Sequence, residues 1–163
     1  MSFESKLHEF LPEIDFGVLG HGFMPYSRDY YVVAQIVGYG VYRCIFTHCV
    51  LASVETRVRD STWSVSWKDE FIDYDAWENS GNPDGFVWGT NCSLAYPGLR
   101  YIEESAAAAD WSERIGRRMN EVTLETEVFF LRLICHDIRK EKLSEEQSPT
   151  NRVLNPLPPR GDA

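Results

Sequence analysis

Two histidines, His21 and His136, could take part in proton transfer. His21 lies between Gly20 and Gly22, and His136 is followed by Asp137 at the end of an apolar run. If the fold brought both histidines to one carboxylate, they could act as acid and base toward a substrate. Adjacent residues of a strand point to opposite faces, so His136 and Asp137 are not a pair in themselves. We take His21 and His136 as an alternative polar site and assign no catalytic residue.

The nearest approach to a metal motif is Cys44, His48 and Cys49. In a strand, Cys44 and His48 would share one face at a separation of about 13 Å, and Cys49 would point the other way. Tetrahedral zinc sites use much closer ligand pairs. Together with Cys92 and Cys135, these cysteines are expected to be reduced and buried as small apolar side chains. The sequence therefore predicts no metal site.

A second candidate is a segment rich in both aromatic and acidic residues. Four of the five tryptophans lie within 26 residues, at Trp63, Trp67, Trp77 and Trp88. Acidic groups accelerate association with a basic surface, and aromatic side chains provide buried anchors. The candidate partner-binding residues are Asp69, Asp73, Tyr74, Asp75, Trp77 and Glu78. Calcium binding is disfavoured, because Glu78 occupies the place of the EF-hand glycine. A merely solvated acidic loop is the simpler alternative.

Composition limits the class of protein. The chain has 163 residues, 44% hydrophobic and 13% aromatic, with a net charge of −9. These totals suit one globular domain whose core needs no disulfide or metal. We expect this domain at 1–143 and a disordered, proline-rich tail at 144–163. An acidic chain is poorly suited to nucleic acid or to an anionic membrane surface.

Targeting and cofactor signals are missing from the sequence. The N-terminal residues lack a basic region followed by a long apolar stretch, so we expect a cytoplasmic protein. No phosphate-binding loop, dinucleotide fingerprint, zincin motif or nucleophile elbow occurs, so no cofactor is indicated.

The elements that must position these residues are mostly strands. Residues 29–48 predict a β-hairpin around the turn Gly38-Tyr39-Gly40. The run 41–59 has no Gly or Pro and is too long for one strand, so we expect a bend near Ser53. Beyond the bend, Val54, Thr56 and Val58 alternate with charged residues and predict one buried face. Further strands are expected at 62–67, 86–94 and 99–103.

The strand at 62–67 would turn Trp63 and Trp67 toward the core. Helices are expected at 4–11, before Pro12, and at 106–119, with Ser105 as N-cap. The composition of 121–138 favours a strand, although its heptad spacing leaves a helix open.

These elements indicate an α+β domain with a mostly antiparallel sheet of about six strands and two or three helices. The leading hypothesis is a non-enzymatic protein-binding module, immunity-like or adaptor-like, for a basic protein partner. The alternative is a small-ligand binder or hydrolase with a pocket lined by tryptophans.

Overall fold

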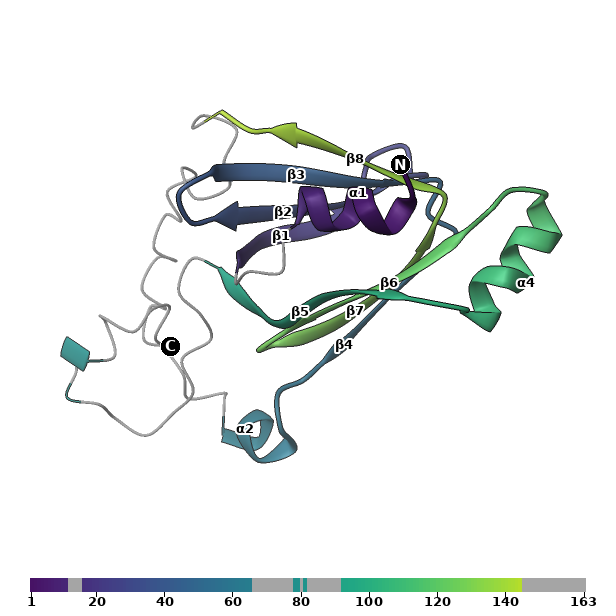
Figure 1. The fold of residues 1–163 in the computed structure, drawn as a ribbon. Coiled ribbons are helices and arrows are strands. Elements are labelled where there is room, and N and C mark those ends of the chain that lie inside the picture. Colours follow the sequence, from purple (N-terminus) through teal and green to yellow (C-terminus); the bar gives the residue numbers. More distant parts are fainter. Residues whose placement is uncertain (12–15, 66–77, 80, 82–91, 145–163) are drawn as a thin grey trace.

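A computed structural model describes residues 1–11, 16–65, 78–79, 81 and 92–144 (Figure 1). The labelled helices are α1 (Phe3–Phe10), α2 (Asp60–Val65) and α4 (Ala106–Ile115). The strands are β1 (Phe16–Phe23), β2 (Tyr30–Ile36), β3 (Gly40–Thr47), β4 (Leu51–Thr56), β5 (Ser93–Ile102), β6 (Asn120–Thr126), β7 (Phe129–Cys135) and β8 (Asp137–Lys142). A single domain with a mostly antiparallel sheet and few helices is confirmed. The described part holds eight strands rather than about six, so the chain is richer in sheet than predicted.

The eight strands follow the order β4-β7-β6-β5-β1-β2-β3-β8, and every pair is antiparallel. β4 follows β3 almost directly, and β8 follows β7 after one residue. The sheet therefore folds into two halves. On one side the halves are joined by the pairing of β1 with β5, and on the other side the chain bends directly from β3 into β4 and from β7 into β8. The bend expected near Ser53 lies instead at 48–50, where His48 has a φ of 48°.

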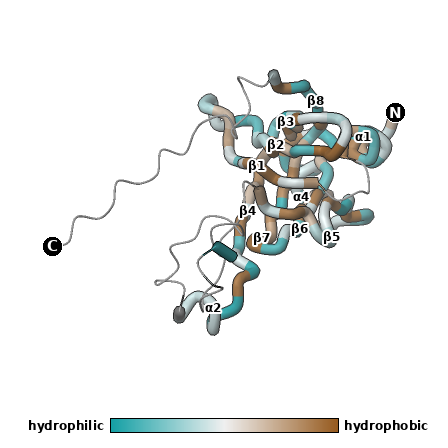
Figure 2. The backbone as a smooth tube through the Cα atoms, turned by 90° about the vertical axis from the view of Figure 1, so that its left-hand side faces the viewer, coloured by the Kyte–Doolittle hydropathy of each residue, from teal (hydrophilic) through white to brown (hydrophobic). Residues whose placement is uncertain are grey.

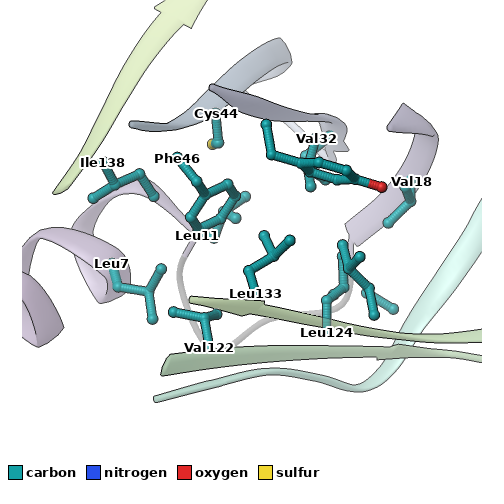
Figure 3. Close-up of a cluster of buried hydrophobic side chains, with 14 of the residues drawn as sticks. Leu7, Leu11, Val18, Val32, Cys44, Phe46, Val122, Leu124, Leu133 and Ile138 are labelled. Atoms are coloured by element: carbon teal, nitrogen blue, oxygen red, sulfur yellow. The ribbon is translucent and has the colours of Figure 1, made fainter. Parts of the chain in front are cut away.

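The main core lies between the two halves (Figure 3). One half contributes Val32 and Phe46, and the other contributes Val122 and Leu133, all at most 2% exposed. α1 closes an open side, and its Leu7 is buried in the same core. The helix predicted at 4–11 begins one residue earlier, because the Ser2 side chain accepts a hydrogen bond from the Ser5 N–H as N-cap.

α4 confirms the predicted cap but is shorter than predicted. Ser105 accepts a hydrogen bond from the Ala108 N–H at 3.0 Å, and the helix ends at Gly116, which has a φ of 69°. This left-handed conformation favours glycine and stops the helix before residue 119. Ala108 and Met119 pack on Ile134, forming a small second cluster. None of the described helices is long and apolar enough to cross a membrane.

The prediction of a strand at 62–67 is wrong for residues 62–65, which are the ones that the structure describes. Residues 60–65 form α2, which stands away from the sheet (Figures 1 and 2). Trp63 is 38% exposed and does not face the core, whereas Trp67 lies outside the described residues. Val54 is also exposed, so the one-sided burial expected for this part of the chain holds only for Val58.

The segment 121–138 is neither one strand nor a helix. It contains most of β6, all of β7 and the start of β8. The β6–β7 turn has no Gly or Pro. The Thr126 hydroxyl stabilises this turn instead, because it accepts hydrogen bonds from the N–H groups of Val128 and Phe129. The turn expected at Pro97-Gly98 is a bulge within β5, and β5 includes residues 99–102 of the strand predicted at 99–103. Residues 86–91 and 145–163, including nearly all of the predicted tail, lie outside the described residues.

Candidate functional site

The two bends meet at one edge of the molecule, and we call residues 48–50 and 136 the corner. The His136 N–H donates to Thr47 O and the Val50 N–H donates to Ile134 O, both at 2.9 Å. The imidazole rings of His48 and His136 stand almost perpendicular, with centroids 5.9 Å apart. The corner thus brings together two histidines that lie far apart in the sequence.

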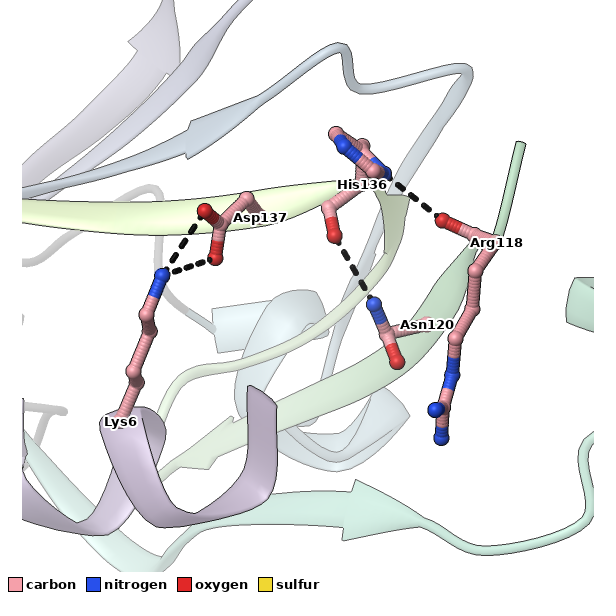
Figure 4. Close-up of polar contacts among 5 residues, drawn as sticks. All are labelled: Lys6, Arg118, Asn120, His136 and Asp137. Carbon is pink, nitrogen blue, oxygen red and sulfur yellow. Dashed lines mark hydrogen bonds and ion pairs between the residues drawn. The ribbon is translucent and has the colours of Figure 1, made fainter. Parts of the chain in front are cut away.

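Backbone and side-chain hydrogen bonds fix the His136 side of the corner (Figure 4). Asn120, at the start of β6, donates from Nδ2 to the carbonyl oxygen of His136 at 2.9 Å. The Nδ1 atom of His136 lies 2.8 Å from the carbonyl oxygen of Arg118. A carbonyl only accepts, so this nitrogen carries the proton. Two bonds therefore hold the bend between β7 and β8 against β6.

The His48 side depends on Asp29, which is only 3% exposed. Its carboxylate accepts from the His48 N–H at 3.0 Å and from the Tyr26 hydroxyl at 2.9 Å. Burial alone would raise the pKa of Asp29, but these hydrogen bonds and the nearby Arg28 outweigh it and lower that pKa. Asp29 therefore stays ionised and stabilises the unusual backbone at His48.

α1 is attached to the corner by an ion pair. The Lys6 ammonium donates to both carboxylate oxygens of Asp137, at 2.8 and 2.9 Å (Figure 4). Burial would raise the pKa of Asp137, but the hydrogen bonds from Lys6 and from the Ile138 N–H, with the Lys6 charge, lower it. The pair fixes the N-terminal helix against the first residue of β8.

A hollow of about 260 Å³ lies between α1 and the corner. We call it the corner hollow; it is lined by residues 1–3 and by Lys6, Arg118, Asn120, His136 and Asp137. Asn120 is 3% exposed, and its Oδ1 atom has no hydrogen-bond partner in the described part of the chain. The corner hollow thus combines groups of both charges with a buried acceptor that lacks a donor.

A larger hollow, of about 470 Å³, lies beside α4. Its lining includes Ser105, Ser112, Arg118 and Glu121. Glu121 is 7% exposed and bonds to both Ser105 and Arg132. Ser112 accepts from the Met119 N–H and donates to the Ala108 carbonyl. These polar groups are already engaged in holding α4 on β6, which indicates a structural role.

The structure does not bring His21 and His136 together. His21 lies 2.7 Å from the Tyr30 hydroxyl, and its ring is 4.6 Å from that of Phe129. Phe129 begins β7 and His136 follows its last residue, about 20 Å away along the strand. Burial lowers the pKa of His21 and raises the pKa of Tyr30 to about 12, so both side chains are neutral near pH 7. His21 therefore lies across the sheet from His136, on β1 and beside the start of β7.

Three of the four cysteines are buried. Burial raises the pKa of Cys44 to about 12 and that of Cys49 to about 11, and it raises the pKa of Cys135 well above its ordinary value. Such thiols are poor nucleophiles. In the ranges that the structure describes, no three His, Cys, Asp or Glu side chains are placed to hold a metal ion.

Most of the predicted partner-binding residues lie outside the part of the chain that the structure describes. Asp69, Asp73, Tyr74, Asp75 and Trp77 lie outside the described residues, and Glu78 is exposed. Sequence reasoning missed Lys6, Arg118 and Asn120, which have no special local pattern. Only the bend at His136 and the pairing of β6 bring these residues to the corner.

Comparison with known proteins gives a family but no activity. No curated protein matches this chain. Among solved structures, an uncharacterized protein from Neisseria gonorrhoeae is similar at 8% sequence identity and a TM-score of 0.38. That alignment covers 79% of this chain and 92% of the other. Residues 2–152 match the family described as YxiG-like protein, and the chain therefore belongs to the YxiG-like family.

Proposed function

We propose that this chain acts by binding another protein, as an immunity-like or adaptor-like module, and not as an enzyme. The observation that carries the proposal is an exposed surface formed by β4 and α2, which we call the β4–α2 surface. Residues 53–56 of β4 are all exposed. Among the described strands, β4 pairs with β7 on one side and with none on the other. An unpaired edge offers backbone N–H and C=O groups to a second chain.

The two ends of the strand order differ in a way that supports this surface. β8, at the other end, carries five charged residues out of six and contacts α1. Charged side chains on an edge strand oppose pairing with another chain. β4 carries one charged residue, Glu55. β4 is therefore the edge that suits contact with a partner.

Charge supports a basic partner. The chain has a net charge of −9, and the acidic segment Asp69–Glu78 follows α2 closely in the sequence. Trp63 in α2, at 38% exposure, precedes that segment and supplies aromatic area. Acidic groups steer a basic protein toward the surface, and an aromatic side chain contributes contact area there.

The alternative, a small-ligand binder or hydrolase with a tryptophan-lined pocket, has less support. Neither of the two hollows described above is lined by tryptophan. Of the two candidate histidines only His136 lines one of these hollows, and it makes its side-chain hydrogen bond to a backbone carbonyl. In the described part of the chain it has no nucleophile hydrogen-bonded to it, as general base catalysis would require.

The test is partner capture by matched lysine variants. The immobilised full chain is used to capture proteins from the host lysate, which mass spectrometry identifies, and affinities are then measured by titration with the purified partner. Val54→Lys places a charge on the β4 edge, whereas Val37→Lys places the same charge on the β2–β3 turn, where Val37 is 84% exposed. We expect Val54→Lys to weaken binding at least tenfold and Val37→Lys to leave it unchanged. Reversal of Asp73 and Asp75 to lysine should slow association.

Circular dichroism of each variant confirms that the fold is retained. Equal affinities for the Val54→Lys and Val37→Lys variants would exclude β4 from the interface. Failure to capture any protein reproducibly would contradict the proposal itself.

A further inference from the structure

We propose that the protein partner adds one extended segment to the sheet as a further strand along β4, and that this segment alternates apolar and basic residues. The inference rests on the proposed function, since it states how the β4–α2 surface is recognised. β4 runs from the corner to α2, and among the described strands it pairs only with β7 (Figure 1). An edge strand of this kind accepts another strand through main-chain hydrogen bonds, and side chains then set the specificity.

The register with β7 shows which backbone groups of β4 are free. Arg57, directly after β4, donates from its N–H to the Val128 carbonyl at 2.9 Å and continues the register of the two strands. In an antiparallel ladder every second residue bonds to the same neighbour, so the odd-numbered residues of β4 face β7. The N–H and C=O groups of Ala52, Val54 and Thr56 therefore point to the free side. They span about 14 Å, which suits a segment of about five residues.

The same residues of β4 carry the side chains of the core face. Ala52 lies opposite Leu133 and Val54 opposite Leu131, and both leucines belong to the core between the two halves of the sheet. Residues that lie directly opposite each other put their side chains on one face. Val54 is nevertheless 48% exposed, so the apolar face of the sheet ends at β4 with this side chain in water. An apolar residue of the added segment would lie beside Val54 and cover it.

Charge selects the residues between the apolar positions. Glu55 lies on the other face of β4 and is exposed, and a basic side chain of the added segment would form a cross-strand pair with it. The net charge of −9 favours a basic segment as well. A second copy of this chain fits less well. Two chains of this charge repel each other, and β4 has no basic residue to place beside Glu55.

The experiment is an NMR titration of the ¹⁵N-labelled full chain with a short capped peptide in which valine and lysine alternate. Hydrogen exchange of the backbone amides is measured in the free and in the bound chain. Two derivatives carry N-methyl groups, one on its valines and the other on its lysines, so each loses the hydrogen bonds along one edge. A third peptide has glutamate in place of lysine. Glu55→Gln is compared with Glu9→Gln, which changes an exposed glutamate of α1.

We expect saturable shifts along β4 and at least about tenfold slower exchange of the Ala52, Val54 and Thr56 amides, while the amides that already bond to β7 keep their rates. One N-methylated peptide should bind at least about tenfold more weakly than the other, and which one it is gives the direction of the added strand. The glutamate peptide should also bind at least about tenfold more weakly. Glu55→Gln should weaken binding by about twofold or more, and Glu9→Gln should have no effect.

Three results would each overturn strand addition. They are shifts without slower exchange of the Ala52, Val54 and Thr56 amides, equal binding of the parent and both N-methylated peptides, and an absence of shifts at about 5 mM peptide. A dimer of the free chain with these amides protected would also overturn it, because the occupant would then be a second copy. If the lysate experiment captures a partner despite such a result, the proposed function stands and only this mode of recognition is excluded. Slower exchange with the peptide but no captured protein would support strand addition and contradict the proposed function.

Discussion

Replacing Ser105 with alanine should destabilise the protein through two hydrogen bonds of one hydroxyl group. Ser105 Oγ accepts from the Ala108 N–H at 3.0 Å and donates to the buried Glu121 carboxylate. Loss of an N-cap costs about 1 kcal/mol. Loss of a hydrogen bond to a charged group costs about 1.5–3 kcal/mol, and the lower end applies because Glu121 keeps its bond to Arg132. We therefore expect a total of about 2–3 kcal/mol.

The effect should depend on pH through Glu121. Burial alone would raise the pKa of Glu121, but hydrogen bonds from Arg132 and Ser105 and the Arg132 charge outweigh it and lower that pKa. A carboxylate with a lowered pKa stabilises the fold above its unfolded pKa of about 4.3, and this stabilisation is lost as the pH falls through the folded value. Without Ser105 the pKa of Glu121 should rise. The difference between variant and parent should be largest near about pH 7 and should shrink below about pH 4.

Thermal and urea unfolding, each measured from about pH 3 to pH 7, test this reasoning. A loss of about 2–3 kcal/mol corresponds to a fall in Tm of roughly 4–12 °C for a domain of this size. Ser105→Thr keeps the hydroxyl group and should recover most of the loss, and the exposed Ser53→Ala should change stability by less than about 0.5 kcal/mol. If Ser105→Ala lowers the free energy of unfolding by less than about 1 kcal/mol, or equally at all pH values, the proposed coupling to Glu121 is wrong.

Three further predictions follow from burial and charge. Leu133→Ala should lower the free energy of unfolding by about 2–5 kcal/mol, because Leu133 is only 2% exposed. Val54→Ala, at 48% exposure, should lower it by less than about 0.5 kcal/mol. Similar losses for both variants in denaturant unfolding would contradict the assigned core. The native protein should react with a thiol reagent first at the half-buried Cys92, and the three buried cysteines should follow only on unfolding, as peptide mapping would show. Lys6→Met should raise the pKa of Asp137, so its stability deficit in pH-dependent unfolding should be full near about pH 7 and should shrink as the pH falls below about 4. A deficit that does not change with pH would point to lost packing instead.

Local signals in the sequence determined the elements that depend on near neighbours. The hairpin of β2 and β3 was predictable because β-branched and aromatic residues flank the Gly38–Gly40 turn, and both α1 and α4 begin at a serine N-cap. The antiparallel class followed from strands joined by short turns. Each of these features involves residues that are close in the chain, so composition and spacing suffice to indicate it.

The bends, the strand count and the corner hollow were decided by tertiary structure. His48 adopts its left-handed conformation because Asp29, 19 residues earlier, accepts its N–H, and no local pattern predicts that contact. Thr126 closes the β6–β7 turn without glycine or proline, which concealed one of the strands. The alternation around Trp63 resembled a strand, yet these residues form α2 away from the sheet, where no neighbouring strand pairs with them in the described part of the chain. Lys6, Asn120 and Asp137 lie together only because the bent strands bring three distant segments to one corner, and such long-range contacts depend on the whole sheet.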